Sequence, residues 1–209
     1  MTEERRPYIP PSTAALLVID MQNAFLHPEG ALGRDGAPIE AMRGVIPRVA
    51  ELHRLCRRLG IPDIWSIQEA LPQDKAREAH RIPPHTAKRS VIPCLKGTWD
   101  AETVEELKPL IDEKSHLLRK NKFGCFFNTN LDFLLRALGA TAILLAGVTT
   151  HACVETTARE AYLRDLDVLV VEDCVASHSE EFHRASLRVI HRYFGLVVPM
   201  RELQTIFSP

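Results

Sequence analysis

The chain has 209 residues, of which 45% are hydrophobic and 25% are charged, and its formal net charge at pH 7 is -1. This composition is typical of a globular protein and excludes the collagen-like, disordered and disulfide-scaffold classes. Because basic and acidic residues balance, we expect no partner that binds mainly through charge, neither a nucleic acid nor a membrane surface.

The five cysteines are scattered along the chain, and no two of them form a CxxC pair. This pattern is typical of reduced thiols and not of a disulfide framework or a zinc knuckle. Residues 1–12 are charged and proline-rich, so we expect an N-terminal extension and not a signal peptide. No apolar run approaches the roughly 20 residues of a membrane-spanning helix. We therefore expect a cytoplasmic protein.

The predicted elements alternate between short apolar strands and longer segments of helical period. In the N-terminal half we expect strands at 14–20, 64–67 and 116–120 and helices at 39–59 and 103–110. Between them, the stretch 69–98 is rich in charges and prolines. This predicts an irregular excursion of the kind that forms lids and pocket walls.

In the C-terminal half we expect strands at 142–148, 168–172 and 196–198 and helices at 130–138, 153–164, 180–194 and 201–207. Strand–helix alternation over the whole length predicts a single α/β domain covering 1–209. The expected fold is a doubly wound, Rossmann-like, mostly parallel six-stranded sheet with helices on both faces.

Polar side chains stand where the predicted strands end. Asp20 ends the first strand, Gln68 follows the second, and Lys120 ends the third, while a short polar turn leads from the fourth strand to Cys153. The carboxyl ends of parallel strands meet at one edge of the sheet, where α/β proteins bind their ligands. We therefore expect an acid, a lysine and a cysteine to converge on one crevice.

Cys153 is predicted to stand at the start of a helix, where the helix macrodipole favours a thiolate and the first amides can hold an oxyanion. The alternative is a small buried side chain, as most intracellular cysteines are. Cys56, on the apolar face of a predicted helix, and Cys174, after a buried strand, fit that alternative.

Asp20 and Lys120 also have ordinary alternatives. Asp20 can cap the turn that follows its strand, and Lys120 belongs to a basic run that can be a solvated strand end. However, a carboxylate that ends an apolar strand is costly unless it is paired or catalytic. Beside Cys153, the two residues supply what a thiol nucleophile needs, a base for its proton and a cation that favours the thiolate.

Other motifs indicate no further site. Three glycines after the first strand have a GxxGxxG spacing, which differs from the dinucleotide pattern GxGxxG, and no Walker or GxSxG motif is present. Three histidines near the C-terminus lack a matching acidic cluster, so we interpret them as surface or capping residues and not as metal ligands: His178, His183 and His191.

Three blocks of sequence make the chain similar to the isochorismatase-like cysteine hydrolases. They read LVIDMQNAF from Leu17, KNKFGCFFNTNL from Lys120 and GVTTHACVETT from Gly147, and the resemblance covers residues 14–198. The resemblance implies the doubly wound fold already predicted and an Asp–Lys–Cys triad.

In that triad, Asp20 would be the general base, Cys153 the nucleophile and Lys120, in preference to Lys122, the orienting cation. The resemblance also implies a cis peptide bond at Val148–Thr149. That bond would aim the Thr149 amide, together with the Cys153 amide, at the oxyanion of the reaction.

The finer resemblance is to the ureidoacrylate amidohydrolase branch and, less closely, to biuret hydrolase. For a substrate of this kind, we expect Gln68 to contact the NH2 or the C=O of a ureido group and Phe25 to form a wall of the pocket. Two positions depart from the branch, since Gly124-Cys125 replaces a Ser-Gly or Ser-Ala pair and Glu69 replaces an amide. Nicotinamidase-like members bind a metal through an Asp-x-His motif after the second strand. The chain reads WSIQE from Trp65, so we expect no active-site metal and no cofactor.

The expected function is that of a cysteine-dependent amidohydrolase, which cleaves a C–N bond of a small linear ureido or carbamoyl amide through a thioester. Two alternatives stay open: an isochorismatase- or nicotinamidase-type hydrolase of another small substrate, and a catalytically silent assembly module. By analogy with the family, we expect a homodimer or homotetramer.

Overall fold

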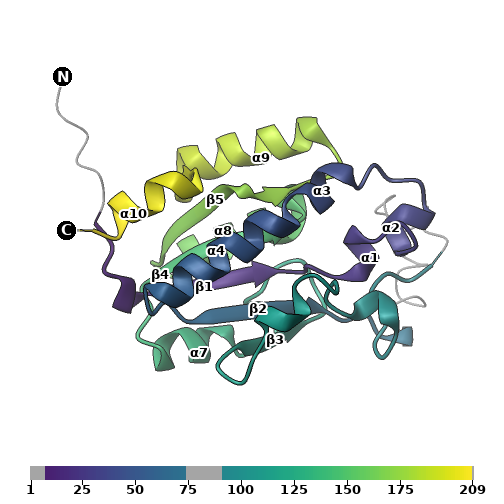
Figure 1. Ribbon diagram of the computed structural model, residues 1–209, viewed down its shortest axis with the longest axis horizontal. Coiled ribbons are helices and arrows are strands. Elements are labelled where there is room, and N and C mark those ends of the chain that lie inside the picture. The colour runs from purple at the N-terminus through teal and green to yellow at the C-terminus, as the bar shows by residue number, and fades with distance from the viewer. Residues whose placement is uncertain (1–7, 74–90, 209) are drawn as a thin grey trace.

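The computed structural model describes residues 8–73 and 91–208 of the chain (Figure 1). Within them, six parallel strands form one sheet in the order β3-β2-β1-β4-β5-β6, which confirms the predicted doubly wound, Rossmann-like topology. The strands are β1 (Ala14–Ile19), β2 (Asp63–Gln68), β3 (His116–Lys120), β4 (Ala142–Val148), β5 (Asp167–Ala176) and β6 (Leu196–Val198). Residues 1–7 of the expected extension and 74–90 of the expected excursion lie outside the described residues.

Helices cover both faces of the sheet (Figure 1). One face packs against α3 (Glu40–Gly44), α4 (Ile46–Arg58) and α10 (Leu203–Ile206). The other packs against α7 (Leu131–Ala137), α8 (Glu155–Tyr162) and α9 (Glu180–Tyr193). Two short helices, α1 (Asn23–Leu26) and α2 (Ala31–Arg34), follow β1. None of the helices in the described ranges is long and apolar enough to cross a bilayer.

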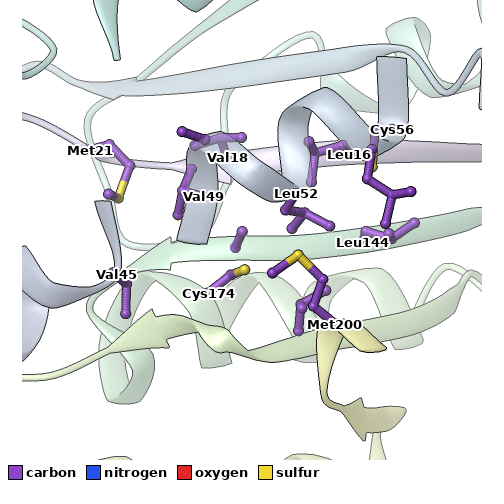
Figure 2. Close-up of a cluster of buried hydrophobic side chains, with 14 of the residues drawn as sticks. Leu16, Val18, Met21, Val45, Val49, Leu52, Cys56, Leu144, Cys174 and Met200 are labelled. Atoms are coloured by element: carbon purple, nitrogen blue, oxygen red, sulfur yellow. The ribbon is translucent and has the colours of Figure 1, made fainter. Parts of the chain in front are cut away.

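The strand β1 lies at the centre of the sheet and is buried along its whole length. Leu16 and Val18 belong to the core under α4, whereas Leu17 and Ile19 belong to the core on the opposite face. Because successive side chains of a strand point to opposite faces, a strand covered on both sides requires a continuous apolar run. Figure 2 shows the α4 side of the sheet, where the two cysteines interpreted as structural lie in the core: Cys56 and Cys174.

Most predicted elements match the structure to within three residues at their ends, whereas the helix at 39–59 and the strand at 168–172 differ more. The helix expected at 39–59 is divided into α3 and α4, and Pro47 stands in the first turn of α4. Proline has no N–H to continue a preceding helix but fits a first helical turn, so the chain restarts there. The strand expected at 168–172 extends to Ala176, because after a bulge its second half pairs with Gly147 and Val148 of β4.

The helix predicted at 103–110 is wrong except for a short 3-10 turn at Lys108–Leu110. Thr103 instead forms an antiparallel bridge with Gln22, and the Val104 amide donates to the Met21 carbonyl at 3.0 Å. Within the segment, the Lys108 amide still donates to the Val104 carbonyl at 3.2 Å. The two long-range contacts place the start of the segment beside the chain that leaves β1.

The close approach of β1 and β4 brings their carboxyl ends together. Ile19 pairs with Ser66 of β2 on one side and with Gly147 of β4 on the other, so the sheet order reverses direction at β1. Gly147 has φ +113°, and a Cβ atom there would lie 2.0 Å from the Ile19 carbonyl oxygen. Only glycine allows this approach. The segments that follow β1 and β4 are therefore neighbours.

Candidate active site

Asp20 and Lys120 form a buried ion pair at the carboxyl edge of the sheet. The Lys120 Nζ atom lies 2.6 Å from Asp20 Oδ2, and neither side chain is exposed. Burial alone would lower the pKa of Lys120, but the charges of Asp20, Cys153 and Cys125 and the hydrogen bond to Asp20 together outweigh it and raise that pKa above its usual range. The ammonium is therefore a stable positive charge at this edge of the sheet.

Cys153 lies beside this ammonium. Its Sγ atom is 3.5 Å from Lys120 Nζ, and the residue is 6% exposed. It stands within a π-helical turn, Thr150–Val154, and the α-helix begins two residues later at Glu155. Thus the structure brings the three predicted residues Asp20, Lys120 and Cys153 together.

Several groups act on the thiol of Cys153. Burial raises its pKa well above the usual value, Lys120 lowers it, and Asp20 raises it again. The effect of burial thus opposes the one expected from a place near a helix start. A buried neutral thiol needs a base that removes its proton at the moment of attack.

Ser66 is a site residue that the sequence analysis missed. Its hydroxyl donates a 2.6 Å hydrogen bond to Asp20 Oδ1 and accepts one of 3.2 Å from the Asp20 amide. Asp20 itself has φ +52°, a rare conformation for a residue with a side chain, and its carbonyl accepts from the Gln22 amide at 2.8 Å. Ser66 and Gln68 share one face of β2 at its carboxyl end, and this alternation is the signal that could have identified Ser66.

Gln68 is held in one orientation. Its Oε1 atom accepts from Lys120 Nζ at 2.9 Å, while the Gln22 side chain binds both the Gln68 amide and the Gln68 carbonyl, each at 2.9 Å. An ammonium group only donates, so the oxygen of the Gln68 side chain must face Lys120. Its NH2 group is the part that remains for another partner.

The turn that carries the predicted oxyanion amides follows β4 directly. The Val148–Thr149 peptide bond is cis, and the Thr149 carbonyl accepts from the amides of Ala152 and Val154 at 3.1 and 3.3 Å. Thr149 is 9% exposed. The oxyanion role of the Thr149 and Cys153 amides stays a prediction.

Phe25 is half-buried and packs against the α4-side core and against a small cluster of Ala24, Ala31, Cys94 and Ala101. Its role as a pocket wall stays a prediction. Next to Gln68, the Glu69 carboxylate contacts the Arg119 guanidinium and lies 4.0 Å from Lys96 Nζ. Two cations and one carboxylate therefore stand beside the site.

The residues at the carboxyl end of β2 do not fit the metal site of the nicotinamidase-like pattern. Ser66 is directed to Asp20, the oxygen of Gln68 to Lys120, and the Glu69 carboxylate to Arg119. In the described part of the chain, no group of three or more His, Cys, Asp or Glu side chains is arranged to hold a metal ion. We derive no step through a metal.

The histidines near the C-terminus lie around the turn that carries Cys153. His183 Nδ1 is 2.8 Å from Thr150 Oγ1, and His151 Nδ1 is 2.8 Å from Ser177 Oγ. The His151 and His178 rings meet edge to face at 5.1 Å. These contacts tie the turn to α9 and to the loop before it, a role that the sequence pattern did not indicate.

Comparison with known proteins identifies the family. The isochorismatase domain model matches residues 14–202. Ureidoacrylate amidohydrolase RutB of Methylobacterium radiotolerans is 32% identical over 90% of this chain and 76% of its own length. A protein of Arabidopsis thaliana named probable inactive nicotinamidase is 34% identical over 83% of this chain and 85% of its own.

Among solved structures, a cysteine hydrolase from Pseudomonas syringae pv. phaseolicola has the same fold. Its TM-score is 0.82 and its identity 23%, over 99% of this chain and 98% of that one. The match of the domain model over almost the whole described chain, together with the two relatives, decides the assignment. The chain belongs to the isochorismatase-like cysteine hydrolase family.

Proposed function

We propose that the protein is a cysteine-dependent amidohydrolase that cleaves a C–N bond of a small linear ureido or carbamoyl amide. The observation that carries this proposal is the position of one buried ammonium, 2.6 Å from the Asp20 carboxylate and 3.5 Å from the Cys153 sulfur. Nucleophilic catalysis by cysteine requires a thiol with a base and a cation beside it.

In the acylation half of the reaction, Asp20 takes the proton of the Cys153 thiol, and the sulfur attacks the substrate carbonyl carbon. The amides of Thr149 and Cys153 donate hydrogen bonds to the resulting oxyanion. Protonated Asp20 then gives its proton to the leaving nitrogen. The C–N bond breaks, ammonia or an amine departs, and a thioester on Cys153 remains.

In the deacylation half, Asp20 takes a proton from water and the hydroxide attacks the thioester carbon. The C–S bond breaks, the acid product departs, and the proton on Asp20 returns to the sulfur. Lys120 keeps its proton throughout, because its raised pKa makes it a fixed charge. Its role is to stabilise the thiolate as it forms and to hold the Asp20 carboxylate in place.

The orientation of Gln68 supports a substrate with an oxygen acceptor next to the scissile bond. Its NH2 group can donate to a ureido or carbamoyl carbonyl, whereas its oxygen is already bound to Lys120. Phe25 would contact the apolar part of the same substrate. Both contacts are part of the proposal.

The alternative functions expected from the family are less well supported. Cleavage of a vinyl ether, the isochorismatase reaction, needs no nucleophilic thiol, and the Ser66–Glu69 segment does not fit a nicotinamidase metal site. A silent assembly module would be expected to lose part of the triad, and Asp20, Lys120 and Cys153 are all present. Unchanged activity after dialysis against a chelator would support the metal-free assignment.

The test is a panel of small ureides, carbamoyl amides and simple primary amides, with ammonia release as the readout. We expect turnover of at least one linear ureide or carbamoyl amide by the natural chain. We expect a loss of at least about 1,000-fold in Cys153→Ala. Full activity of Cys153→Ala, or hydrolysis of vinyl ethers without any amide, would reject the proposal.

A further inference from the structure

The segment Gly124, Cys125 and Phe126, which follows β3, is bound to the helix that follows the nucleophile. The Cys125 amide donates to Thr157 Oγ1 at 3.2 Å, and the Phe126 amide donates to Glu160 Oε2 at 3.0 Å. Two consecutive backbone donors are thus satisfied by two side chains of α8, which begins two residues after Cys153.

Thr157 connects this segment directly to the nucleophile. Its side chain is fully buried, and its hydroxyl donates to the Cys153 carbonyl at 2.7 Å while it accepts the Cys125 amide. One hydroxyl therefore bridges the backbone of the residue that carries the reactive sulfur and the backbone of the segment after β3.

Glu160 reaches the Phe126 amide only because residue 124 is glycine. A Cβ atom on Gly124 would lie 2.2 Å from Glu160 Oε2, where the carboxylate now stands. The Arg164 guanidinium covers the Phe126 ring at 4.4 Å and donates to the Glu160 carbonyl at 2.9 Å. Gly124 and Cys125, which stand where the related branch has a Ser-Gly or Ser-Ala pair, thus lie in a segment that contacts α8.

The same segment determines the surroundings of the Lys120 ammonium. Lys120 Nζ donates to the Lys122 carbonyl at 3.0 Å, and Lys122 stands two residues before Gly124. The other partners of the ammonium are Asp20, Gln68 and the Cys153 sulfur. A shift of the segment would move the Lys122 carbonyl, and the ammonium would lose one of the hydrogen bonds that hold it beside the Cys153 sulfur.

We propose that Thr157 and Glu160 are positioning residues for the reaction. By binding the amides of Cys125 and Phe126, they keep the segment after β3 on α8 and so fix the Lys120 ammonium relative to the Cys153 sulfur. The expected change in kcat rests on the proposed function. The expected change in the reactivity of the Cys153 thiol does not depend on any substrate.

The test compares Thr157→Val, which removes both hydrogen bonds of the hydroxyl, with Thr157→Ser, which keeps them. Thr156→Val is the matched control, because it makes the same atomic change one position away. We expect Thr157→Val to lower kcat by about 10- to 100-fold with KM changed less than about threefold, since small displacements of reacting groups have effects of this size. Thr157→Ser is expected to stay within about threefold of the natural chain.

The second readout is the rate at which iodoacetamide alkylates Cys153, measured against pH. With the ammonium less well placed, we expect Thr157→Val to move this profile to higher pH and to slow alkylation about tenfold at a given pH, an effect that Thr157→Ser lacks. Glu160→Ala is expected to act in the same direction, and it replaces Thr157→Val in both measurements if that variant does not fold.

A drop in melting temperature with unchanged kcat, KM and alkylation profile would mean that Thr157 and Glu160 only stabilise the fold, and would overturn the inference. The alkylation arm also separates the two proposals. If the natural chain hydrolyses no amide, the proposed function fails, whereas a shifted profile in Thr157→Val still supports positioning.

Discussion

The Lys120 ammonium and the Asp20 carboxylate are 2.6 Å apart, and both side chains are completely buried. Such a pair is seldom a net source of stability, because the attraction between the charges barely offsets the loss of their hydration. Its position against the Cys153 sulfur explains its presence better. In the proposed mechanism, the pair supplies the base and the cation that the Cys153 thiol needs.

Removing one member of the pair should separate stability from activity. In Lys120→Met the Asp20 charge stays buried without its partner, so we expect a loss of about 3–5 kcal/mol in the free energy of unfolding and no turnover. In the double variant Asp20→Asn, Lys120→Met, much of the stability is expected to return while activity stays absent. Urea unfolding and ammonia release measure the two quantities, and activity in the double variant would contradict the proposed roles.

Thiol reactivity tests the state of Cys153. Because burial raises its pKa, we expect alkylation to be slow near neutral pH and to rise continuously through about pH 9. The other four cysteines are fully buried, whereas Cys153 is 6% exposed, so Cys153 should still react first. Peptide mapping after partial alkylation identifies the labelled residue. A rate that reaches its plateau below neutral pH would show a resting thiolate and contradict the structure.

Gln68 should affect substrate recognition more than chemistry. In Gln68→Ala the NH2 donor is lost, and we expect KM for a ureide to rise about tenfold, as for one lost hydrogen bond to a carbonyl. Gln68→Glu keeps an oxygen for Lys120 but offers no donor, so it should have the same effect on KM. Steady-state kinetics on one responsive ureide make the comparison. A higher affinity in Gln68→Glu would mean that the substrate presents a donor at this position.

The histidines around the turn that carries Cys153 are expected to lower the free energy of unfolding as the pH falls below neutral. Burial lowers the pKa values of His151 and His183 below 6.5. For His151, the neighbouring His178 lowers the pKa further and Glu155 raises it. For His183, Arg184 lowers the pKa further, while Glu180 and Glu172 raise it. The unfolded chain therefore binds protons first as pH falls. The stabilising effect is complete above about pH 6.5 and is lost as pH falls through the lower, folded-state values.

We accordingly expect a lower urea midpoint at about pH 5.5 than at about pH 7.5, and a smaller difference between the two in the double variant His151→Asn, His183→Gln. Asparagine and glutamine keep a polar side chain without the titration. The same difference in the variant and the natural chain would assign the acid sensitivity to other groups.

Much of the site could be predicted because its chemistry lies in local sequence. Asp20, Lys120 and Cys153 each stand where an apolar strand ends or a helix begins, and parallel strands bring such ends together. Ser66 was missed because its partner depends on the register between β1 and β2. The contacts of Thr157 and Glu160 were missed for a similar reason, since they join residues more than thirty positions apart.

The remaining errors come from tertiary context. The helix predicted at 103–110 is wrong where long-range contacts hold the chain, since Thr103 bridges to Gln22 and the Val104 amide donates to the Met21 carbonyl. The raised pKa of the Cys153 thiol could not be predicted from the helix start, because burial has the largest effect on that pKa and a local pattern does not show it. Local patterns identify the elements and the reactive groups, but they do not give the degree of burial.

The central claim is that catalysis proceeds through a thioester on Cys153, and hydroxylamine tests it most directly. Hydroxylamine attacks a thioester faster than water does, so a responsive amide or ureide turned over in its presence should yield a hydroxamate or hydroxyurea. The account predicts that this product increases with hydroxylamine concentration in the natural chain and is absent in Cys153→Ala. Normal ammonia release with only the hydrolysed acid, at every hydroxylamine concentration, would contradict it.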